Sequence, residues 1–472
     1  MAHCLNCNLQ FNTIQRRHHC RQCGNIFCNN CSSKRQPLPQ LHYDKPVRIC
    51  NRCCDLATYS RQAGSLTPSD RVESAKGLCT LTHDTLGRKM IIANYLDIIV
   101  LLLNNFNVTV YKHITKAIAN LSENEIYRID ILESNILSLL SEYLYNPQGD
   151  NEIVLNISIT FEYLSMEENA LIRTHIGEKC LHIIAELSRS YNNQLRHSSS
   201  IVLLNLTKNA MTRDLIIREG GVQAFIAMAL CEDISLQSAS TEAISILSTN
   251  RKKRKEKKRK EKKRKEKKRK EKKRKEKKRK EKKRKEKKER NSGLINSNYL
   301  IIVAKYQRKV VEGGALPPLL LLLNSPVEKI LLYTLSALSS LSENVDNQLS
   351  IGQVGGIKPM INILSYSHDN RIPFHAATCL YHLSLSQSNY SLLIQQELFD
   401  VLSKIIIVNY TNTSHDLLHI CLKLLGNLSN IKEGKVIIRK NQSIMSILRI
   451  MVYSTNHLQS LASIIFNNCE SH

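Results

Sequence analysis

Eight cysteines near the start of the chain form four Cys-x-x-Cys pairs. The pairs are Cys4/Cys7, Cys20/Cys23, Cys28/Cys31 and Cys50/Cys53. A Cys-x-x-Cys turn points two thiolates at one ion, and two such turns complete the tetrahedral coordination of structural zinc. Four pairs therefore predict two closed sites that hold two Zn²⁺ ions, with no open coordination position for catalysis. The spacing alone leaves open which pairs share an ion.

The surroundings of these pairs support a structural metal site in a reducing compartment. Nine of the 15 cysteines fall within residues 4–54, and the first residues, "MAHCLNC", contain no apolar signal region. Without a secretion signal, we expect reduced thiols in the cytoplasm rather than disulfides. A head of about 60 residues buries too little apolar surface to fold comfortably alone, so bound metal should supply much of its stability. Cys54 directly follows a ligand and is expected to point away from the ion.

The residues between the pairs resemble a known family. The segments "RRHHCRQCG" (16–24), "NIFCNNC" (25–31) and "PVRIC" (46–50) are similar to the FYVE zinc finger, over residues 4 to about 56. The resemblance implies an interleaved arrangement, with Cys4, Cys7, Cys28 and Cys31 on one zinc and Cys20, Cys23, Cys50 and Cys53 on the other. It also implies a ligand, phosphatidylinositol 3-phosphate on the cytosolic face of endosomal membranes.

A cluster of basic side chains fits that ligand. The candidates for the lipid head group are Arg16, Arg17, His18, His19, Arg21 and Arg48. Guanidinium groups offer planar donor forks that match phosphate oxygens better than lysine does. The histidines are not needed for zinc, and they can donate to a phosphate more readily once protonated, below about pH 6.5. The alternative is a solvated basic face that merely attracts anionic lipid.

Two features differ from the family pattern. The family carries a Trp-x-x-Asp segment before the first cysteine, whereas this chain starts three residues before Cys4 and contains no Trp. We therefore expect either a longer natural N-terminus or reduced phosphoinositide discrimination. In the loop "FNTIQ" (11–15), only Ile14 is available for membrane insertion, because Phe11 is interpreted as core. A single head should bind membranes weakly, so dimerisation or another basic segment would be needed for residence.

Beyond residue 60 a short signature recurs at regular intervals. A leucine followed by Ser or Thr stands at Leu121, Leu164, Leu206, Leu247, Leu341, Leu383 and Leu428, with spacings of 43, 42, 41, 94, 42 and 45 residues. A period near 42 with helical patterning predicts an α-solenoid. Weaker copies near both ends suggest eight or nine units.

The parts of one unit can be recognised in residues 308–344. A short helix should end at Gly313 and Gly314, a second begin at the two prolines that follow, and a third run from about Val327 to Leu341. This layout resembles armadillo repeats, which implies a groove lined by third helices that binds extended peptides. Three asparagines that precede signature leucines are the groove candidates, namely Asn120, Asn205 and Asn427. The alternative is that each caps or bridges neighbouring helices.

Most of the positive charge lies in one low-complexity tract. Residues 251–290 hold 32 basic and 8 acidic residues, a net +24 of the total +27, in a repeat of Lys-Lys-Arg-Lys-Glu. This uneven distribution argues against a uniformly basic coat protein, and the absence of interleaved aromatic residues argues against base stacking. The tract is interpreted as a solvated insert between two repeats, arising from expansion of a simple purine sequence.

Together these patterns predict an all-α armadillo-type solenoid with a small N-terminal double-zinc FYVE-type domain and a basic low-complexity insert. The expected boundaries are 1–60 for the finger, 61–250 and 304–472 for two blocks of repeats, and 251–303 for the insert. The expected function is that of a non-catalytic adaptor, cytoplasmic and peripheral on endosomal membranes, with a protein partner in the groove, and with a homodimer as one way to strengthen membrane binding. The alternatives are an interaction scaffold that has lost lipid specificity, a RING-like ubiquitin ligase, and a basic nuclear or nucleic-acid binder.

Overall fold

The computed structural model divides into two compact units, Met1–Val202 and Leu203–His472. It describes residues 2–145, 150–167, 180–249, 304–365, 369–411, 415–453 and 458–470. The whole of the predicted insert, residues 251–303, therefore lies outside the described residues. Within those ranges, no helix is both long and apolar enough to cross a bilayer.

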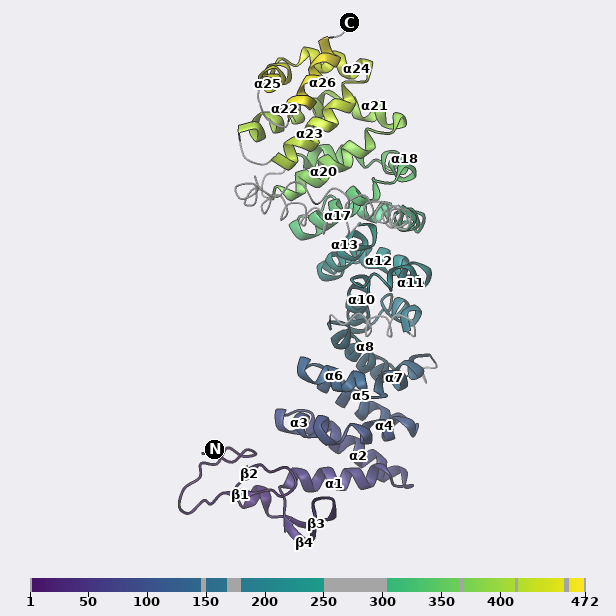
Figure 1. The fold of residues 1–472 in the computed structure, drawn as a ribbon. Helices are drawn as coiled ribbons and strands as arrows, with labels where there is room; N and C mark the ends of the chain where they lie inside the picture. Colours follow the sequence, from purple (N-terminus) through teal and green to yellow (C-terminus); the bar gives the residue numbers. More distant parts are fainter. Residues whose placement is uncertain are drawn as a thin grey trace, which may run out of the picture. The chain divides into compact units, whose positions relative to one another are not determined.

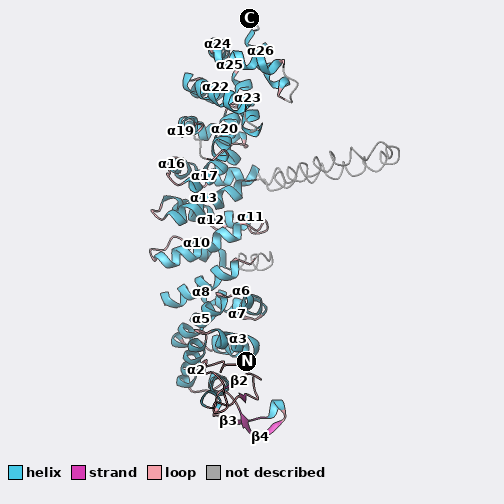
Figure 2. Cartoon of the chain, turned by 90° about the vertical axis from the view of Figure 1, so that its left-hand side faces the viewer, coloured by secondary structure: helices cyan, strands magenta, loops and turns pink. Residues whose placement is uncertain are grey.

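The first unit begins with a small domain of short strands around a compact core. Its elements are β1 (His18–His19), β2 (Ile26–Phe27), η1 (Asn30–Ser32), β3 (Arg35–Leu38), η2 (Pro39–Leu41) and β4 (Tyr43–Arg48). β1 pairs with β2 and β3 with β4, both antiparallel. Phe27, Leu38, Ile49 and Leu56 are buried beneath them. Figure 2 shows the magenta strands confined to this N-terminal part.

The rest of the first unit is helical. Its helices are α1 (Asn51–Ala63), α2 (Pro68–Leu81), α3 (Thr85–Asn94), α4 (Leu96–Asn104), α5 (Val108–Ser122), α6 (Glu125–Glu133), α7 (Ile136–Tyr145) and α8 (Asn151–Ser165), and α10 (Asn193–Thr207) contains the boundary between the units. α1 packs against α2, α2 against α5, and α5 against α8 (Figure 1). The longest helices of successive repeats therefore stack directly on one another. The predicted boundary at residue 60 falls inside α1.

The second unit continues the same pattern. Its helices are α11 (Arg213–Arg218), α12 (Gly221–Leu230), α13 (Ile234–Ser248), α16 (Leu316–Leu322), α17 (Glu328–Leu341), α18 (Val345–Gln353), α19 (Ile357–Ile363), α20 (Arg371–Leu383), η3 (Gln387–Asn389), α21 (Tyr390–Leu393), α22 (Gln396–Thr411), α23 (His415–Leu428), α24 (Lys432–Lys440), α25 (Gln442–Val452) and α26 (Gln459–Glu470); residues 304–312 are also helical. The third helices α13, α17, α20, α23 and α26 pack in chain order. The predicted helical repeat solenoid is confirmed.

The predicted glycine turns are present between first and second helices. Gly220, Gly314 and Gly355 have φ angles of 83°, 90° and 86°. These values lie in the left-handed region that glycine enters without a steric penalty. A side chain at these positions would strain the backbone at the junction of two short helices, which explains one glycine of each recurring Gly-Gly pair.

The recurring signature has a packing role and a capping role. Its leucines, at 121, 164, 206, 247, 341, 383 and 428, are all buried. The hydroxyl that follows satisfies a carbonyl at the end of the third helix: Ser342 Oγ donates to Ser339 O at 3.0 Å, and Ser429 Oγ donates to Gly426 O at 2.7 Å. Because the last carbonyls of a helix have no partner within it, a buried helix end needs such a donor.

The residues on either side of the insert belong to adjacent repeats. α13 and α17 pack against each other, as α17 and α20 do, although 94 residues separate their signature leucines. Gln307 Nε2 donates to Ser248 O at 3.1 Å and to Ser340 O at 2.7 Å, and so joins the end of α13 to the end of α17. The stack is therefore complete without the insert.

Deletion of residues 251–302 should leave the solenoid folded. The closure entropy of a surface loop changes by only about 0.6 kcal/mol per doubling of its length. We therefore expect the melting temperature, followed by circular dichroism, to stay within about 8 °C of the full chain. A larger drop would show that the insert contributes to the core and that the repeat register is wrong.

Candidate metal centres

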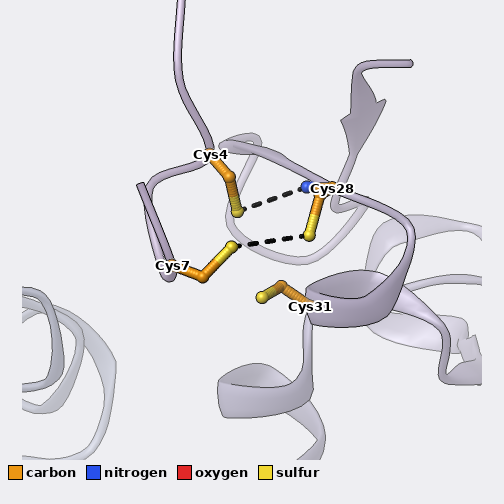
Figure 3. A group of neighbouring side chains, drawn as sticks. All are labelled: Cys4, Cys7, Cys28 and Cys31. Atoms are coloured by element: carbon orange, nitrogen blue, oxygen red, sulfur yellow. Dashed lines mark hydrogen bonds between the residues drawn. The ribbon is translucent and has the colours of Figure 1, made fainter. Parts of the chain in front are cut away.

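The first cluster brings together the sulfurs of Cys4, Cys7, Cys28 and Cys31. These atoms all lie within 4.8 Å of one another, and Figure 3 shows the four side chains converging on one point. Cys7 Sγ and Cys28 Sγ are 3.7 Å apart. A zinc ion with four Zn–S bonds of about 2.3 Å separates its ligand sulfurs by about 3.8 Å, so the spacing suits a tetrahedral zinc.

The second cluster has the same composition. Cys20, Cys23, Cys50 and Cys53 also place their sulfurs within 4.8 Å of one another, and Cys23 Sγ lies 4.0 Å from Cys50 Sγ. The two groups of sulfurs in the structure are therefore the two sets of ligands that the family resemblance implies. Within the described part of the chain, these two are the groups of metal-ligating side chains that could hold an ion, and neither includes a histidine.

Both clusters are built from the same two parts. In each, the first pair lies in a turn closed by a left-handed residue four positions after its first cysteine: Asn8, with φ of 55°, and Gly24, with φ of 72°. The second pair lies at a helical turn, in η1 for the first cluster and at the start of α1 for the second. A turn and a helix terminus approach the ion from different segments, so the metal joins parts of the chain more than 20 residues apart.

Backbone amides of the second pair donate to sulfurs of the first pair. Cys28 N donates to Cys4 Sγ at 3.3 Å, and Cys50 N donates to Cys20 Sγ at 3.1 Å. Four thiolates around one Zn²⁺ leave a net charge of about −2, and such N–H donors disperse it. Because these sulfurs accept hydrogen bonds from backbone N–H groups, the arrangement favours the deprotonated thiolate.

Crowding separates the pKa values of the second cluster in the absence of an ion. Hydrogen bonds from the thiols of Cys23, Cys50 and Cys53 lower the pKa of Cys20 far below its usual range. Hydrogen bonds with Cys20, Cys23 and Cys50 raise the pKa of Cys53 far above its usual range. Four sulfurs this close cannot all ionise without a cation, and a zinc ion takes the place of the shared protons. The residues present therefore fit two structural zinc ions.

The basic residues of the finger meet at the junction of β1 and β4. Arg21 N donates to Arg48 O at 2.9 Å, which places the end of the "RRHHCR" segment beside the last residue of β4. Arg48 Nη1 donates to Asn29 Oδ1 at 3.0 Å and to Ser32 O at 2.8 Å. Part of the Arg48 guanidinium is therefore engaged in holding η1. Arg16, Arg17 and Arg21 are exposed.

The pKa of His18 is affected by these neighbouring charges. Burial, with the nearby guanidinium groups of Arg48 and Arg16, lowers the pKa of His18 below its ordinary value. Its ring is therefore mostly neutral near pH 7. A bound phosphate would offset the two positive neighbours and favour the protonated ring.

The loop before β1 presents one apolar side chain to solvent. Ile14 is 84% exposed. Asn12 Oδ1 accepts from Ile14 N at 2.9 Å and from Gln15 N at 2.7 Å, so an Asx-type turn holds the loop in shape. Phe11 is half-buried, and the Arg17 guanidinium lies 6.0 Å from its ring centroid. Our sequence analysis missed Asn12, whose only signal is its position at the start of a short polar loop.

Two of the groove asparagines bridge neighbouring repeats. Asn120 Nδ2 donates to Thr82 Oγ1 at 2.9 Å, and Asn427 Nδ2 donates to Ser384 Oγ at 2.8 Å. In each pair, the acceptor is the hydroxyl that follows the signature leucine of the preceding repeat. This is the bridging arrangement that the sequence left open as the alternative.

The third groove candidate, Asn205, is buried. Its Oδ1 accepts from Lys208 Nζ at 3.0 Å. Peptide binding by any of the three asparagines stays a prediction, and for Asn120 and Asn427 it would require the amide to exchange or share an existing hydrogen bond.

Metal analysis and chelation test the two sites. The purified chain should contain two zinc ions, and Cys20→Ser or Cys28→Ser should each reduce the content to one. A strong chelator should unfold the finger, because zinc affinity is part of its folding energy, while most of the helical circular dichroism remains. One ion or none in well-folded wild-type protein would contradict the two-site structure.

Comparisons with known proteins agree with this geometry. A model of the FYVE zinc finger matches residues 1–59. The chain is 56% identical over 50 residues to a Lateral signaling target protein 2 homolog from Brugia malayi, and 53% identical over 52 residues to RUN and FYVE domain-containing protein 1 from Homo sapiens. Each alignment covers 11% of this chain, and 8% and 7% of the two relatives respectively. The chain therefore matches less than a tenth of the length of these relatives.

Solved structures match the helical part by fold. A chain from work on the interaction between cadherin and beta-catenin has a TM-score of 0.58 and 14% identity, covering 88% of this chain and 78% of that chain. An engineered protein has a TM-score of 0.55 and 15% identity, covering 88% and 99%. Residues 1–59 are thus a FYVE zinc finger with two tetracysteine sites, followed by a helical repeat solenoid that resembles armadillo proteins.

Proposed function

We propose that the chain is a non-catalytic adaptor that binds phosphatidylinositol 3-phosphate in membranes through its finger and a protein partner through its solenoid. The observation that carries this proposal is the exposed basic cluster of Arg16, Arg17 and Arg21, on the segment that directly follows the exposed Ile14. One part of the finger thus offers charge for a phosphate and an apolar side chain for the bilayer.

The chemistry of the cluster suits a phosphomonoester. Guanidinium groups can form two parallel hydrogen bonds to one phosphate, and such charge-assisted bonds are stronger than neutral ones. The backbone hydrogen bond between Arg21, in the turn after β1, and Arg48, at the end of β4, holds these two residues next to each other. Because all eight zinc ligands are cysteines, His18 and His19 are free of metal and available to the head group.

One apolar side chain gives limited membrane affinity. Full burial of Ile14 would contribute about 1.5–3 kcal/mol. Stable residence on a membrane generally takes a second signal. The proposal is therefore a peripheral association with endosomal membranes from the cytoplasm, strengthened by a second copy of the chain or by the basic segment at 251–290.

The protein partner would lie along the third helices. The stacking of α13, α17, α20 and α23 supports this proposal because it places their equivalent side chains in rows along one surface. The bridging role of Asn120 and Asn427 points to other third-helix side chains as the contacts. The alternative function is that of a scaffold whose finger has no phosphoinositide preference, and the lipid experiments below distinguish the two.

Loss of one exposed arginine should weaken lipid binding. For Arg17→Ala or Arg21→Ala in the full chain, we expect at least a tenfold weaker affinity for liposomes with phosphatidylinositol 3-phosphate, about 1.4 kcal/mol, with two zinc ions retained. Arg61→Ala is the matched control, because Arg61 is exposed on α1 and donates to Ala57 O within its own helix. Liposome sedimentation at physiological salt measures the effect. Unchanged binding by both variants would refute the head-group site, and equal binding to all phosphoinositides would favour the rival scaffold.

Binding should strengthen as the pH falls from 7.5 to 6. Burial, together with the charges of Arg48 and Arg16, lowers the pKa of His18 in the free protein. Phosphate binding would raise that pKa, so protons and lipid would bind cooperatively. The gain should be roughly threefold to fivefold for each histidine whose pKa rises by one unit. Replacing His18 and His19 by Gln should flatten the profile. A profile that is flat in the wild type would exclude a role for protonated histidine.

A further inference from the structure

The finger and the first repeat share a helix. α1 begins directly after Cys50, contains the ligand Cys53, and continues to Ala63. Its later turns pack against α2, where Ser74 Oγ donates to Tyr59 O at 2.8 Å. The last zinc ligands and the first interhelical contacts of the solenoid therefore lie on one rigid element.

A second connection runs from a zinc ligand to the first repeat. Asn6 Nδ2 donates to Cys31 Sγ at 3.3 Å, and Arg52 Nε donates to Asn6 Oδ1 at 2.6 Å. Arg52 Nη1 forms an ion pair with Asp84. Asp84 also caps α3, because its Oδ1 accepts from Gly87 N at 2.9 Å. A continuous path of hydrogen bonds thus joins the first zinc cluster to the N-terminus of α3.

Each step of this path has a physical consequence for the metal. The Asn6 N–H adds a donor to a thiolate, which disperses charge from the zinc centre. Arg52 fixes the orientation of the Asn6 amide. Because Arg52 Nε donates to the amide oxygen, the amide nitrogen faces Cys31. Asp84 in turn holds Arg52, whose side chain is only 19% exposed. Hydrogen-bonded groups outside the ligand shell are known to orient ligands and to slow metal loss.

The solenoid contains ion pairs equivalent to the one between Arg52 and Asp84. Arg88 Nη1 lies 3.1 Å from Glu123 Oε2, and Arg128 Nη1 lies 2.9 Å from Glu167 Oε1, each joining one repeat to the next. The Arg52–Asp84 pair therefore connects the finger to the first repeat in the way that later repeats are connected to one another.

We propose that Asn6, Arg52 and Asp84 are positioning residues for the first zinc ion, and that through them the first helical repeat stabilises the metal site. In this arrangement the finger acts as the N-terminal cap of the solenoid, and zinc retention depends on the repeat that follows.

Zinc-release kinetics of the full chain test the proposal. The rate of zinc transfer to a chromogenic chelator is followed, and cysteine alkylation with mass spectrometry identifies which cluster has opened. Arg52→Ala and Asp84→Asn should speed release from the Cys4/Cys7/Cys28/Cys31 cluster by roughly tenfold, within the range seen for outer-shell partners of metal ligands. Asn is itself a good N-cap, so Asp84→Asn removes the charge and keeps the cap on α3.

Two further variants separate positioning from general destabilisation. Asn6→Asp can still accept from Arg52 but has no N–H for Cys31, so it should release the first ion as fast as Arg52→Ala. Arg88→Ala, which breaks the equivalent pair one repeat later, should release both ions at the wild-type rate. Hydrogen exchange after chelation should show lost protection in α2 and α3 but not in α17 and α20.

Several outcomes would overturn the proposal. These are a wild-type release rate in Arg52→Ala, equal acceleration of both ions, acceleration by Arg88→Ala to the same extent, or protection of α2 and α3 that is unaffected by chelation. Any of these would show that Asn6, Arg52 and Asp84 do not act specifically on the first zinc site.

Discussion

The fold of the finger depends on one constraint: each zinc ion must be coordinated by cysteines from two segments that are far apart in the chain. The first cluster joins residues 4–7 to 28–31, and the second joins residues 20–23 to 50–53. Because the two spans overlap, the two ions together connect all the segments between residues 4 and 53. A domain with so few buried apolar side chains thereby obtains a defined structure. The segment that follows β1 lies beside the end of β4, where Arg21 N donates to Arg48 O.

Because both metal sites are closed, they determine which kinds of interaction the finger can make. Four cysteine sulfurs would fill the coordination positions of each zinc ion, so the metal would offer no Lewis-acid position to a substrate. The side chains that the finger presents to a ligand are its exposed Arg, His and Ile residues. The solenoid is stabilised differently, by stacked helices whose ends are capped by the signature hydroxyls, and α1 belongs to both systems.

The sequence predicts the local features well. Cys-x-x-Cys spacing indicates the zinc sites, and the pairing follows from the resemblance to the FYVE family. The Gly-Gly pairs mark the left-handed turns at Gly220, Gly314 and Gly355, because only backbone conformation is involved. The contacts of Arg52 were not predictable, since they join residues 32 and 46 positions apart with no repeating pattern. For the asparagines, the sequence allowed two roles, contact with a peptide or a bridge between helices. The bridging hydrogen bonds of Asn120 and Asn427 depend on how neighbouring repeats stack, which is known only from the structure. The boundary expected at residue 60 missed that one helix serves both parts.

Cadmium NMR can distinguish the interleaved pairing of the cysteines from any other pairing. The zinc ions are replaced by ¹¹³Cd in the full chain, and correlations between each metal and the cysteine β-protons are recorded. We expect two ¹¹³Cd signals, one correlated with Cys4, Cys7, Cys28 and Cys31 and the other with Cys20, Cys23, Cys50 and Cys53. A signal that connects Cys4 and Cys7 with Cys20 and Cys23 would contradict it.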